Sequence, residues 1–284
     1  MHSLREYYYL VRLDRPIGIL LLLWPTLWGL WVAAEGKPDP LVMFVFVAGV
    51  VLMRSAGCAV NDFADRHVDP HVERTQNRPL AAGRITEKEA LAVFIVLSLL
   101  AFVLVLLMNR LTIIMSFAGA LLAFSYPFMK RFTHMPQVYL GVAFGWGIPM
   151  VFAAQTGSVP PVAWAMFMAN VFWAVAYDTA YAMVDREDDL RIGVRSTAIL
   201  FGRYDRLMIG INHALCLLLL AWVGFYLQLG AVYFISLAVA AGIAGYEQWL
   251  MRHRERGACF KAFLNNHYFG MVIFAGLVVH YLQN

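Results

Sequence analysis

Charged residues are scarce in this chain of 284 residues. Asp, Glu, Lys and Arg together make up 14% of the sequence, whereas hydrophobic residues make up 61%. A soluble globular domain carries about 25% charged residues, so this composition excludes that class of protein. The chain is therefore predicted to be an integral membrane protein that crosses the bilayer several times.

Cysteine is the second scarce residue type. Cys58, Cys216 and Cys259 are far apart in the sequence and form no CxxC pair. This spacing favours three structural thiols. His67 and His71 have i, i+4 spacing, but no third nitrogen or sulfur ligand lies nearby, so both are predicted to be interfacial.

Long apolar runs are abundant. A helix needs about 20 residues to cross the ~30 Å of hydrocarbon in a bilayer. Nine segments meet this length, at about 16–34, 40–61, 88–108, 111–127, 136–156, 161–184, 207–227, 230–250 and 262–282. They predict an all-α integral membrane protein with about nine transmembrane helices in a single domain, 1–284.

The basic residues are distributed unevenly among the connections. Of the 22 Lys and Arg residues, 19 fall at the N-terminus or after the second, fourth, sixth and eighth segments. Lys37 and Arg110 lie in other connections, and Arg54 lies inside a segment. Because positively charged loops stay in the cytoplasm, the N-terminus is predicted to be cytoplasmic, and so are two acidic clusters at 61–69 and 185–189.

Each acidic cluster lies at the end of an apolar segment and includes oxygen ligands that share one helical face. The first set has i, i+4, i+8 spacing and consists of Asn61, Asp65 and Asp69. The second has i, i+7, i+11 spacing and consists of Asp178, Asp185 and Asp189. Oxygen-only ligands suit Mg²⁺, and carboxylates near a bilayer need a cation. The alternative is solvated charges neutralised by Arg66, Arg74, Arg186 and Arg191, but the repetition favours metal sites.

The clusters also indicate an internal repeat. Gly83-Arg84 and Gly202-Arg203 follow the two clusters at matching points, and four crossings separate the clusters. Parallel halves at about 16–135 and 136–282 are therefore predicted to face each other around a central cavity.

Several motifs are similar to those of the UbiA superfamily of intramembrane prenyltransferases. They extend over nearly the whole chain and comprise Arg15-Pro16-Ile17-Gly18, Trp24-Pro25-Thr26, Asn61 through Asp69, Asn77-Arg78-Pro79-Leu80, Tyr126 through Arg131, and Tyr177-Asp178-Thr179 through Asp189. The resemblance implies Mg²⁺ ligands at the family's NDxxDxxxD motif and second aspartate motif, which correspond to Asn61, Asp62, Asp65, Asp69, Asp185 and Asp189.

The resemblance also implies an activity. It is strongest to the members that transfer a polyprenyl group from an all-trans polyprenyl diphosphate to 4-hydroxybenzoate, at the ring carbon ortho to the hydroxyl, in ubiquinone biosynthesis. The implied fold is a UbiA-type bundle around a central cavity that opens to lipid. The implied location is the bacterial inner membrane, with a cytoplasmic active site. The expected partners are the two substrates and membrane lipid, with no nucleic acid.

This chemistry assigns roles to further residues. The leaving diphosphate carries about three negative charges, which metal ions and basic residues stabilise. The expected catalytic residues are Asp65, Asp185 as the base for the ring proton, Lys130 and Arg131. The expected substrate-binding residues are Arg15, Arg54, Tyr126, Lys130, Arg131 and Asp178. An aromatic lining for the allylic cation is expected from Trp146, Phe172, Trp173 and Tyr177.

Two hypotheses remain for Arg54, and several for the whole chain. The partner of Arg54 is either the carboxylate of the acceptor, or Glu247 or backbone carbonyls in a helix-packing contact. Arg15 is a competing candidate for substrate binding, and Lys130 and Arg131 are otherwise ordinary interfacial anchors.

Alternative acceptors are a dihydroxynaphthoate, homogentisate or haem. A cation transporter would carry its acidic residues at mid-helix, and a CDP-alcohol phosphotransferase would carry a DGxxAR motif, which is absent.

Overall fold

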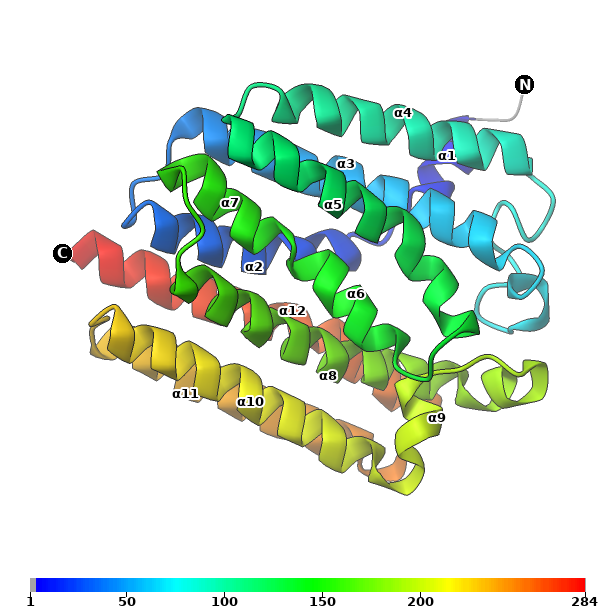
Figure 1. The fold of residues 1–284 in the computed structure, drawn as a ribbon. Coiled ribbons are helices and arrows are strands. Elements are labelled where there is room, and N and C mark those ends of the chain that lie inside the picture. Colours follow the sequence, from blue (N-terminus) through cyan, green and yellow to red (C-terminus); the bar gives the residue numbers. More distant parts are fainter. Residues whose placement is uncertain (1–3, 284) are drawn as a thin grey trace.

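Helices account for all the regular secondary structure in residues 4–283, which the computed structural model describes (Figure 1). The α-helices are α1 (Leu4–Leu10), α2 (Ile17–Ala33), α3 (Pro40–Asp65), α4 (Glu87–Val105), α5 (Arg110–Ser125), α6 (Pro136–Gly145), α7 (Gly147–Thr156), α8 (Pro161–Ile192), α9 (Thr197–Phe201), α10 (Asp205–Tyr226), α11 (Ala231–Leu250) and α12 (Arg256–Gln283). Short 3-10 turns complete the set: η1 (Asp69–His71), η2 (Tyr126–Arg131), η3 (Gly202–Tyr204) and η4 (Met251–His253).

Each of the nine predicted segments is helical, which confirms the all-α prediction. Within the described residues, seven helical stretches are long and apolar enough to cross a membrane. Helix α2 is shorter, with 17 residues, and α8 includes the polar residues Asn170 and Asp178. The count of nine crossings and the cytoplasmic N-terminus remain predictions.

Helices α2, α8 and α12 meet in the interior of the bundle. Trp28 of α2 packs on Trp173 of α8, with ring centroids 5.3 Å apart, and its Nε1 donates to the carbonyl oxygen of Gly270 in α12 at 2.9 Å. Neighbouring helices α6, α10 and α12 all pack against α8. Protein therefore surrounds much of α8, which explains how it carries polar side chains inside a membrane protein.

The predicted helix 136–156 is two helices, α6 and α7, that meet at Trp146. Pro149 has no N–H to bond the carbonyl of Gly145, so the helical hydrogen-bond ladder is interrupted there. Small residues flank the break: a Cβ at Gly145 would lie 2.7 Å from the amide nitrogen of Asn170, and one at Gly147 would lie 2.9 Å from Thr26 Oγ1. The break thus lets α6 and α7 pack closely on α8 and α2.

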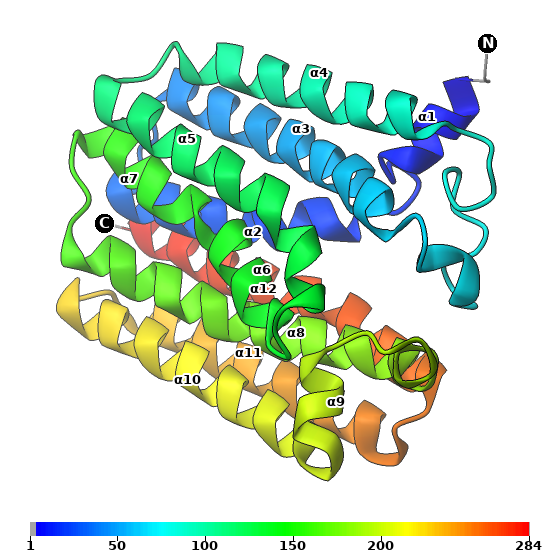
Figure 2. The same ribbon diagram turned by 45° about the vertical axis from the view of Figure 1, so that its right-hand side comes forward.

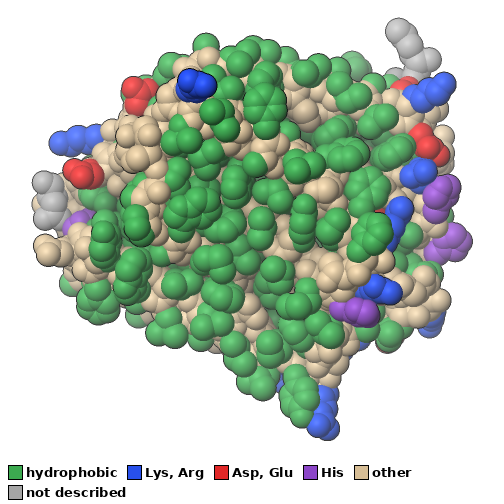
Figure 3. All heavy atoms as spheres, in the orientation of Figure 1, with side chains coloured by type: hydrophobic (Ala, Val, Ile, Leu, Met, Phe, Trp, Pro, Cys, Tyr) green, Lys and Arg blue, Asp and Glu red, His purple; other side chains and the backbone are tan. Residues whose placement is uncertain are grey.

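The outer surface has a broad apolar band. Figure 3 shows hydrophobic side chains over the middle of the molecule and charged side chains gathered toward its two ends. Phe117 and Leu121 on α5 are 61% and 66% exposed, which is typical of a surface that faces lipid. The described ends of the chain lie at opposite ends of the bundle, in agreement with an odd number of crossings (Figures 1 and 2).

Candidate active site

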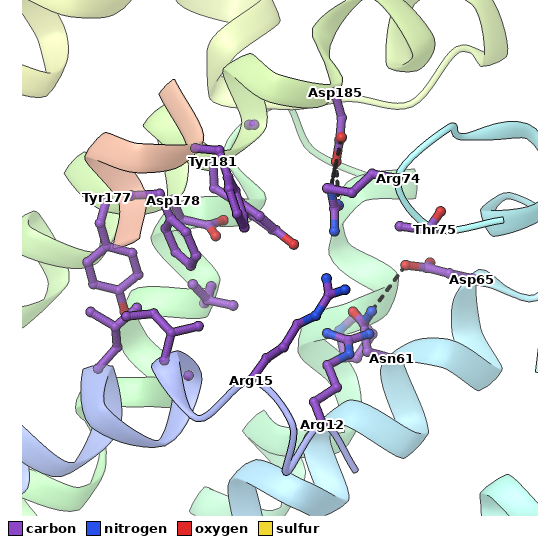
Figure 4. A pocket seen from close by; sticks show the side chains of 18 of the residues that line it. Arg12, Arg15, Asn61, Asp65, Arg74, Thr75, Tyr177, Asp178, Tyr181 and Asp185 are labelled. Atoms are coloured by element: carbon purple, nitrogen blue, oxygen red, sulfur yellow. Dashed lines mark hydrogen bonds and ion pairs between the residues drawn. The ribbon is translucent and has the colours of Figure 1, made fainter. Parts of the chain in front are cut away.

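A cavity of about 1150 Å³ lies between the two acidic clusters. Its walls come from α2, α3, the connection between α3 and α4, η2, α6, α8 and α12 (Figure 4). Ten of the predicted site residues line it: Arg15, Arg54, Asn61, Asp65, Asp69, Tyr126, Lys130, Asp178, Asp185 and Asp189. The fold therefore brings both sets of oxygen ligands to one space.

The first acidic set lies where α3 ends. Asn61 Nδ2 donates to Asp65 Oδ2 at 3.3 Å, across one helical turn. Lys130 of η2 pairs with the same oxygen at 2.5 Å. The second oxygen, Asp65 Oδ1, is buried and has no hydrogen-bond partner. One carboxylate oxygen in the cavity wall is therefore left without a hydrogen-bond partner.

The predicted continuous helical stripe through Asp69 is wrong. Helix α3 ends at Asp65, and Asp69 lies in the 3-10 turn η1, where Pro70 has no N–H that could continue the α-helical hydrogen-bond ladder to Arg66. The turn still directs Asp69 to the cavity, where Arg78 Nη1 donates to its Oδ2 at 2.7 Å. Burial raises the pKa of the Asp69 carboxyl, against the lowering effect of Arg78.

The second acidic set lies on one continuous helix, as predicted. Helix α8 extends to Ile192, well beyond the predicted end at 184, so Asp178, Asp185 and Asp189 share a helix and line the same cavity. Arg74 reaches across from the connection between α3 and α4: its Nε and Nη2 donate to Asp185 at 3.0 and 2.5 Å (Figure 4). Its guanidinium also lies 4.4 Å from the ring centroid of Tyr181.

Two predicted site residues do not line the cavity. Asp62 is buried and pairs with Arg12 at 2.5 Å and Arg78 at 3.2 Å. Arg131 donates through Nη2 to the carbonyl oxygen of Ala64, and so binds the end of α3. Their roles in metal and substrate binding remain predictions.

Most of the predicted aromatic lining lies elsewhere. Trp173 is fully buried between Trp28 and Phe269, and Trp146 packs on Trp164 and Phe167. Among the residues predicted for this lining, Tyr177 is the one that the cavity includes. The other aromatic residues on the wall are Tyr9, Tyr126, Phe144, Tyr181, Phe260, Phe263 and Tyr268. Sequence spacing did not distinguish cavity-facing aromatics from those in helix–helix contacts.

Arg54 lines the cavity and has no carboxylate partner among the described residues. Its Nη1 contacts Cys58 Sγ, and its Nε is buried without a hydrogen-bond partner. The side chain lies directly on Gly18, where an added Cβ would overlap the guanidinium. Glu247 instead contacts His213, at 3.7 Å, and Asn265, at 3.2 Å, so the predicted packing pair between Arg54 and Glu247 is wrong.

The donor set fits a hard divalent cation. The cavity presents the carboxylates of Asp65, Asp69, Asp185 and Asp189 and the amide of Asn61, and one buried oxygen of Asp65 has no partner. Oxygen ligands shared with substrate phosphates are those that Mg²⁺ prefers. In the described part of the chain, no three His, Cys, Asp or Glu side chains already form a cluster that could hold a metal ion. Lys130, Arg78 and Arg74 pair with three of the carboxylates instead.

Comparison with known proteins identifies the family. The model of the UbiA prenyltransferase family matches residues 22–273. The chain belongs to this family. A 4-hydroxybenzoate octaprenyltransferase from Nitrosococcus oceani is 64% identical over 276 residues, which cover 97% of each chain. One from Methylococcus capsulatus is 63% identical over 285 residues, 99% of this chain and 98% of the relative.

Solved structures of UbiA homologues share the fold. The apo structure of a homologue from Aeropyrum pernix K1 has a TM-score of 0.81 and 25% identity, over 94% of this chain and 98% of that one. A homologue from Archaeoglobus fulgidus, solved with GPP and Mg²⁺, has a TM-score of 0.73 and 17% identity, over 96% and 99% of the two chains.

Several residues of this UbiA-family site were missed by sequence reasoning. Arg12, Arg74, Arg78, Gln137 and Tyr181 all line the cavity. Arg78 lies in the Asn77-Arg78-Pro79-Leu80 motif, and Arg74 was considered only as a neutralising charge. Arg74 and Arg78 both lie in a basic connection directly after the first acidic cluster, and this position could have identified them as site residues. Nothing in the spacing of Arg12, Gln137 or Tyr181 pointed to the site.

Proposed function

We propose that this chain transfers a polyprenyl group from an all-trans polyprenyl diphosphate to the ring carbon ortho to the hydroxyl of 4-hydroxybenzoate, and releases diphosphate. The observation that carries the proposal is near full-length identity of 58–64% to proteins named 4-hydroxybenzoate octaprenyltransferase. A cavity lined by two acidic sets and by several guanidinium groups supports it. We place the reaction at the inner membrane, with this cavity facing the cytoplasm.

We propose Mg²⁺ as the cofactor, held by Asn61, Asp65 and Asp69 on one side and by Asp185 and Asp189 on the other. When bound, it neutralises the charge that develops on the leaving diphosphate. Asp62 is assigned to orient this set, because its ion pairs with Arg12 and Arg78 connect the end of α3 to two basic side chains of the cavity.

Basic side chains in the cavity would receive the diphosphate. Lys130, Arg74 and Arg78 each pair with a cavity carboxylate and lie on the wall, so each can contact a phosphate oxygen once its carboxylate has another partner. Charge-assisted hydrogen bonds of this kind are short and strong, and they favour the transition state as the charge develops. Arg15 and Tyr126 line the same space and would complete the contacts to the substrates.

Arg54 would hold the acceptor. Its buried Nε has no partner and its guanidinium faces the cavity, so a carboxylate on the acceptor would satisfy it in bidentate geometry. Asp178 and Gln137 line the same wall, and Asp178 would contact the phenol end of the acceptor. We assign the base that accepts the ring proton to the Asp185 carboxylate.

Membranes or detergent-purified protein with a labelled acceptor would test the function. We expect Mg²⁺-dependent transfer of label from 4-hydroxybenzoate into a lipid-soluble product in the presence of an all-trans polyprenyl diphosphate. Dihydroxynaphthoate and homogentisate serve as competing acceptors, and Mg²⁺-free buffer with a chelator serves as the control. Preferred turnover of another acceptor would reassign the acceptor while leaving the prenyltransferase reaction in place.

A further inference from the structure

Arg256, the first residue of α12, contacts three carboxylates at the end of the bundle that holds the acidic sets. Its Nη1 lies 3.0 Å from Glu73 Oε2 and 3.5 Å from Asp188 Oδ2, and its Nη2 lies 3.0 Å from Glu187 Oε2. Glu73 belongs to the connection between α3 and α4, whereas Glu187 and Asp188 belong to α8. We refer to these four side chains as the Arg256 bridge. The bridge joins two elements that are far apart in the sequence.

Local helix stability does not explain an arginine at this position. The N-terminus of a helix is the positive end of the helix dipole, so a basic side chain is unfavourable there. The side chain of Asp188 is 10% exposed, and a carboxylate buried to this extent needs a basic partner. Glu73 is 77% exposed and has no such need. The contact between Arg256 and Glu73 therefore serves to hold the connection.

The bridge lies next to an ion pair of the cavity. Glu73 precedes Arg74 in the chain, and Asp188 follows Asp185 by three residues, almost one helical turn. Arg74 pairs with Asp185 inside the cavity, whereas no residue of the bridge lines the cavity. The bridge thus repeats, outside the cavity, the contact that the inner pair makes between the connection and α8.

The inner pair has to open during the reaction. In the proposed function Arg74 contacts the diphosphate, while Asp185 holds Mg²⁺ and accepts the ring proton, so neither side chain remains available to the other. In the described part of the chain, the other ion pairs of the connection go to α1, α3 or α4, or stay within it: Arg84–Glu6, Arg66–Glu87, Arg78–Asp62 and Arg78–Asp69. The Arg256 bridge then holds the connection to α8.

We propose that Arg256 is a positioning residue that keeps the connection over the cavity while the inner pair is open, and so excludes water from the allylic carbon. This inference rests on the proposed function. The connection lines the cavity from Val68 to Arg84, so its displacement would admit water. When the C–O bond breaks, diphosphate leaves with the electron pair. Water that then forms a C–O bond to the allylic carbon and loses a proton yields a polyprenol in place of the prenylated acceptor.

The ratio of polyprenol to prenylated 4-hydroxybenzoate measures this exclusion of water. We expect Arg256→Gln and Glu73→Gln each to raise the ratio about two- to fivefold, the scale of a partly exposed ion pair. The double variant should raise it no further, because both substitutions remove the same contact. Glu73→Gln leaves the contacts of Arg256 with α8 in place, so its effect cannot come from a displaced α8.

Arg252→Gln is the matched control. It removes an arginine charge from the same exposed end, but Arg252 contacts Trp249 of its own segment, with its guanidinium 4.1 Å from the ring centroid and its Nη1 3.0 Å from the carbonyl oxygen. Its product ratio should equal that of the unsubstituted protein. Salt screens exposed ion pairs, so higher ionic strength should raise the ratio of the unsubstituted protein and leave that of Arg256→Gln unchanged.

Three outcomes would overturn the proposal: an unchanged ratio in Glu73→Gln, an equal rise in Arg252→Gln, or the same salt dependence in Arg256→Gln and the unsubstituted protein. If Arg256→Gln does not fold, Glu73→Gln decides, because this side chain is exposed at the surface. Formation of prenylated acceptor by the unsubstituted protein tests the proposed function separately. Transfer with an unchanged ratio in Glu73→Gln would overturn the role of the bridge alone.

Discussion

Pairing of carboxylates with basic side chains is the main feature of the site at the scale of single residues. Asp65 pairs with Lys130, Asp69 with Arg78, and Asp185 with Arg74. Each pair joins a proposed metal ligand to a proposed phosphate ligand, so the cavity keeps both kinds of group in place before substrates bind. Arg54 Nε and Asp65 Oδ1 are buried polar atoms of the cavity wall that lack hydrogen-bond partners.

Loss of one carboxylate should affect turnover far more than folding. We expect Asp65→Asn and Asp185→Asn each to lower kcat by at least ~10²-fold, the scale of losing a charge that acts in the transition state. Glu187→Gln is the control, because Glu187 is 71% exposed and pairs with Arg256 at the surface. Activity assays together with size-exclusion profiles in detergent separate catalysis from folding. Near-normal Mg²⁺-dependent turnover in either variant would remove that carboxylate from the mechanism.

Arg54→Gln should affect the two substrates differently. Its guanidinium would form a charge-assisted pair with the acceptor carboxylate, and such hydrogen bonds contribute about 1.5–3 kcal/mol each. We expect the KM for 4-hydroxybenzoate to rise about 10- to 100-fold, with little change in the KM for the prenyl diphosphate. An acceptor phenol without a carboxylate should be insensitive to the substitution. Equal losses for both acceptors would contradict the clamp.

Gly18→Ala provides a second test of the same contact. The added Cβ would overlap the Arg54 guanidinium and displace it, although position 18 itself carries no charge. We expect the same selective rise in the KM for 4-hydroxybenzoate. A normal KM would show that the position of Arg54 against Gly18 does not matter for acceptor binding.

At the scale of secondary-structure elements, close helix contacts place the cavity walls. Helix α8 carries Tyr177, Asp178, Tyr181, Asp185 and Asp189 along one cavity-facing side, while Trp173 one turn earlier packs on α2 and α12. The same helix thus fixes the core and presents the second acidic set. The contact at Gly270 holds α12 against α2 and α8 at the base of the cavity.

Gly270→Ala should destabilise this contact. An added Cβ would lie 2.6 Å from Trp173 and 2.8 Å from Trp24, so the helices must separate or two indole rings must move. Overpacking of this kind costs about 1–3 kcal/mol. Gly257→Ala is the matched control on α12, because its Cβ meets no atom within 4 Å. Thermal unfolding in detergent should show a lower midpoint for the first variant alone. An equal midpoint for the two variants would contradict the packing argument.

At the scale of the whole molecule, the site depends on segments from both predicted halves. Arg74, before α4 in the first half, pairs with Asp185 of α8 in the second half. The glycines of the two Gly-Arg pairs, Gly83 and Gly202, share positive φ values of 70° and 51° at turns. The division into halves at 16–135 and 136–282 remains a prediction.

Cysteine labelling would test the orientation. All three native cysteines, Cys58, Cys216 and Cys259, are buried, so background labelling should be low. Because the basic connections are predicted to be cytoplasmic, Gln76→Cys and Arg191→Cys should react only with reagents that enter the cytoplasm. Ser158→Cys, at the other end of the bundle, should react from outside. Reversed labelling would overturn the orientation but not the enzyme class.

The sequence by itself determined the helical segments and the family. Apolar runs of sufficient length have few stable forms in a bilayer other than helices, and the nine predicted segments are all helical. The motifs that contain Asp65, Asp185 and Lys130 pointed to residues that line one cavity. These features depend on local periodicity and on residue types, which are present in the sequence itself.

Only the tertiary structure decided which side chains meet. It placed Asp69 beyond the end of α3, turned Arg131 to a backbone carbonyl, and paired Arg74 with a carboxylate from a distant helix. The sequence also left open whether Arg54 has a partner inside the protein, since a buried charge can pair with a residue of any helix that packs against the helix carrying it. Such contacts depend on how the helices pack across long distances in the sequence, so residue spacing along the chain cannot fix them.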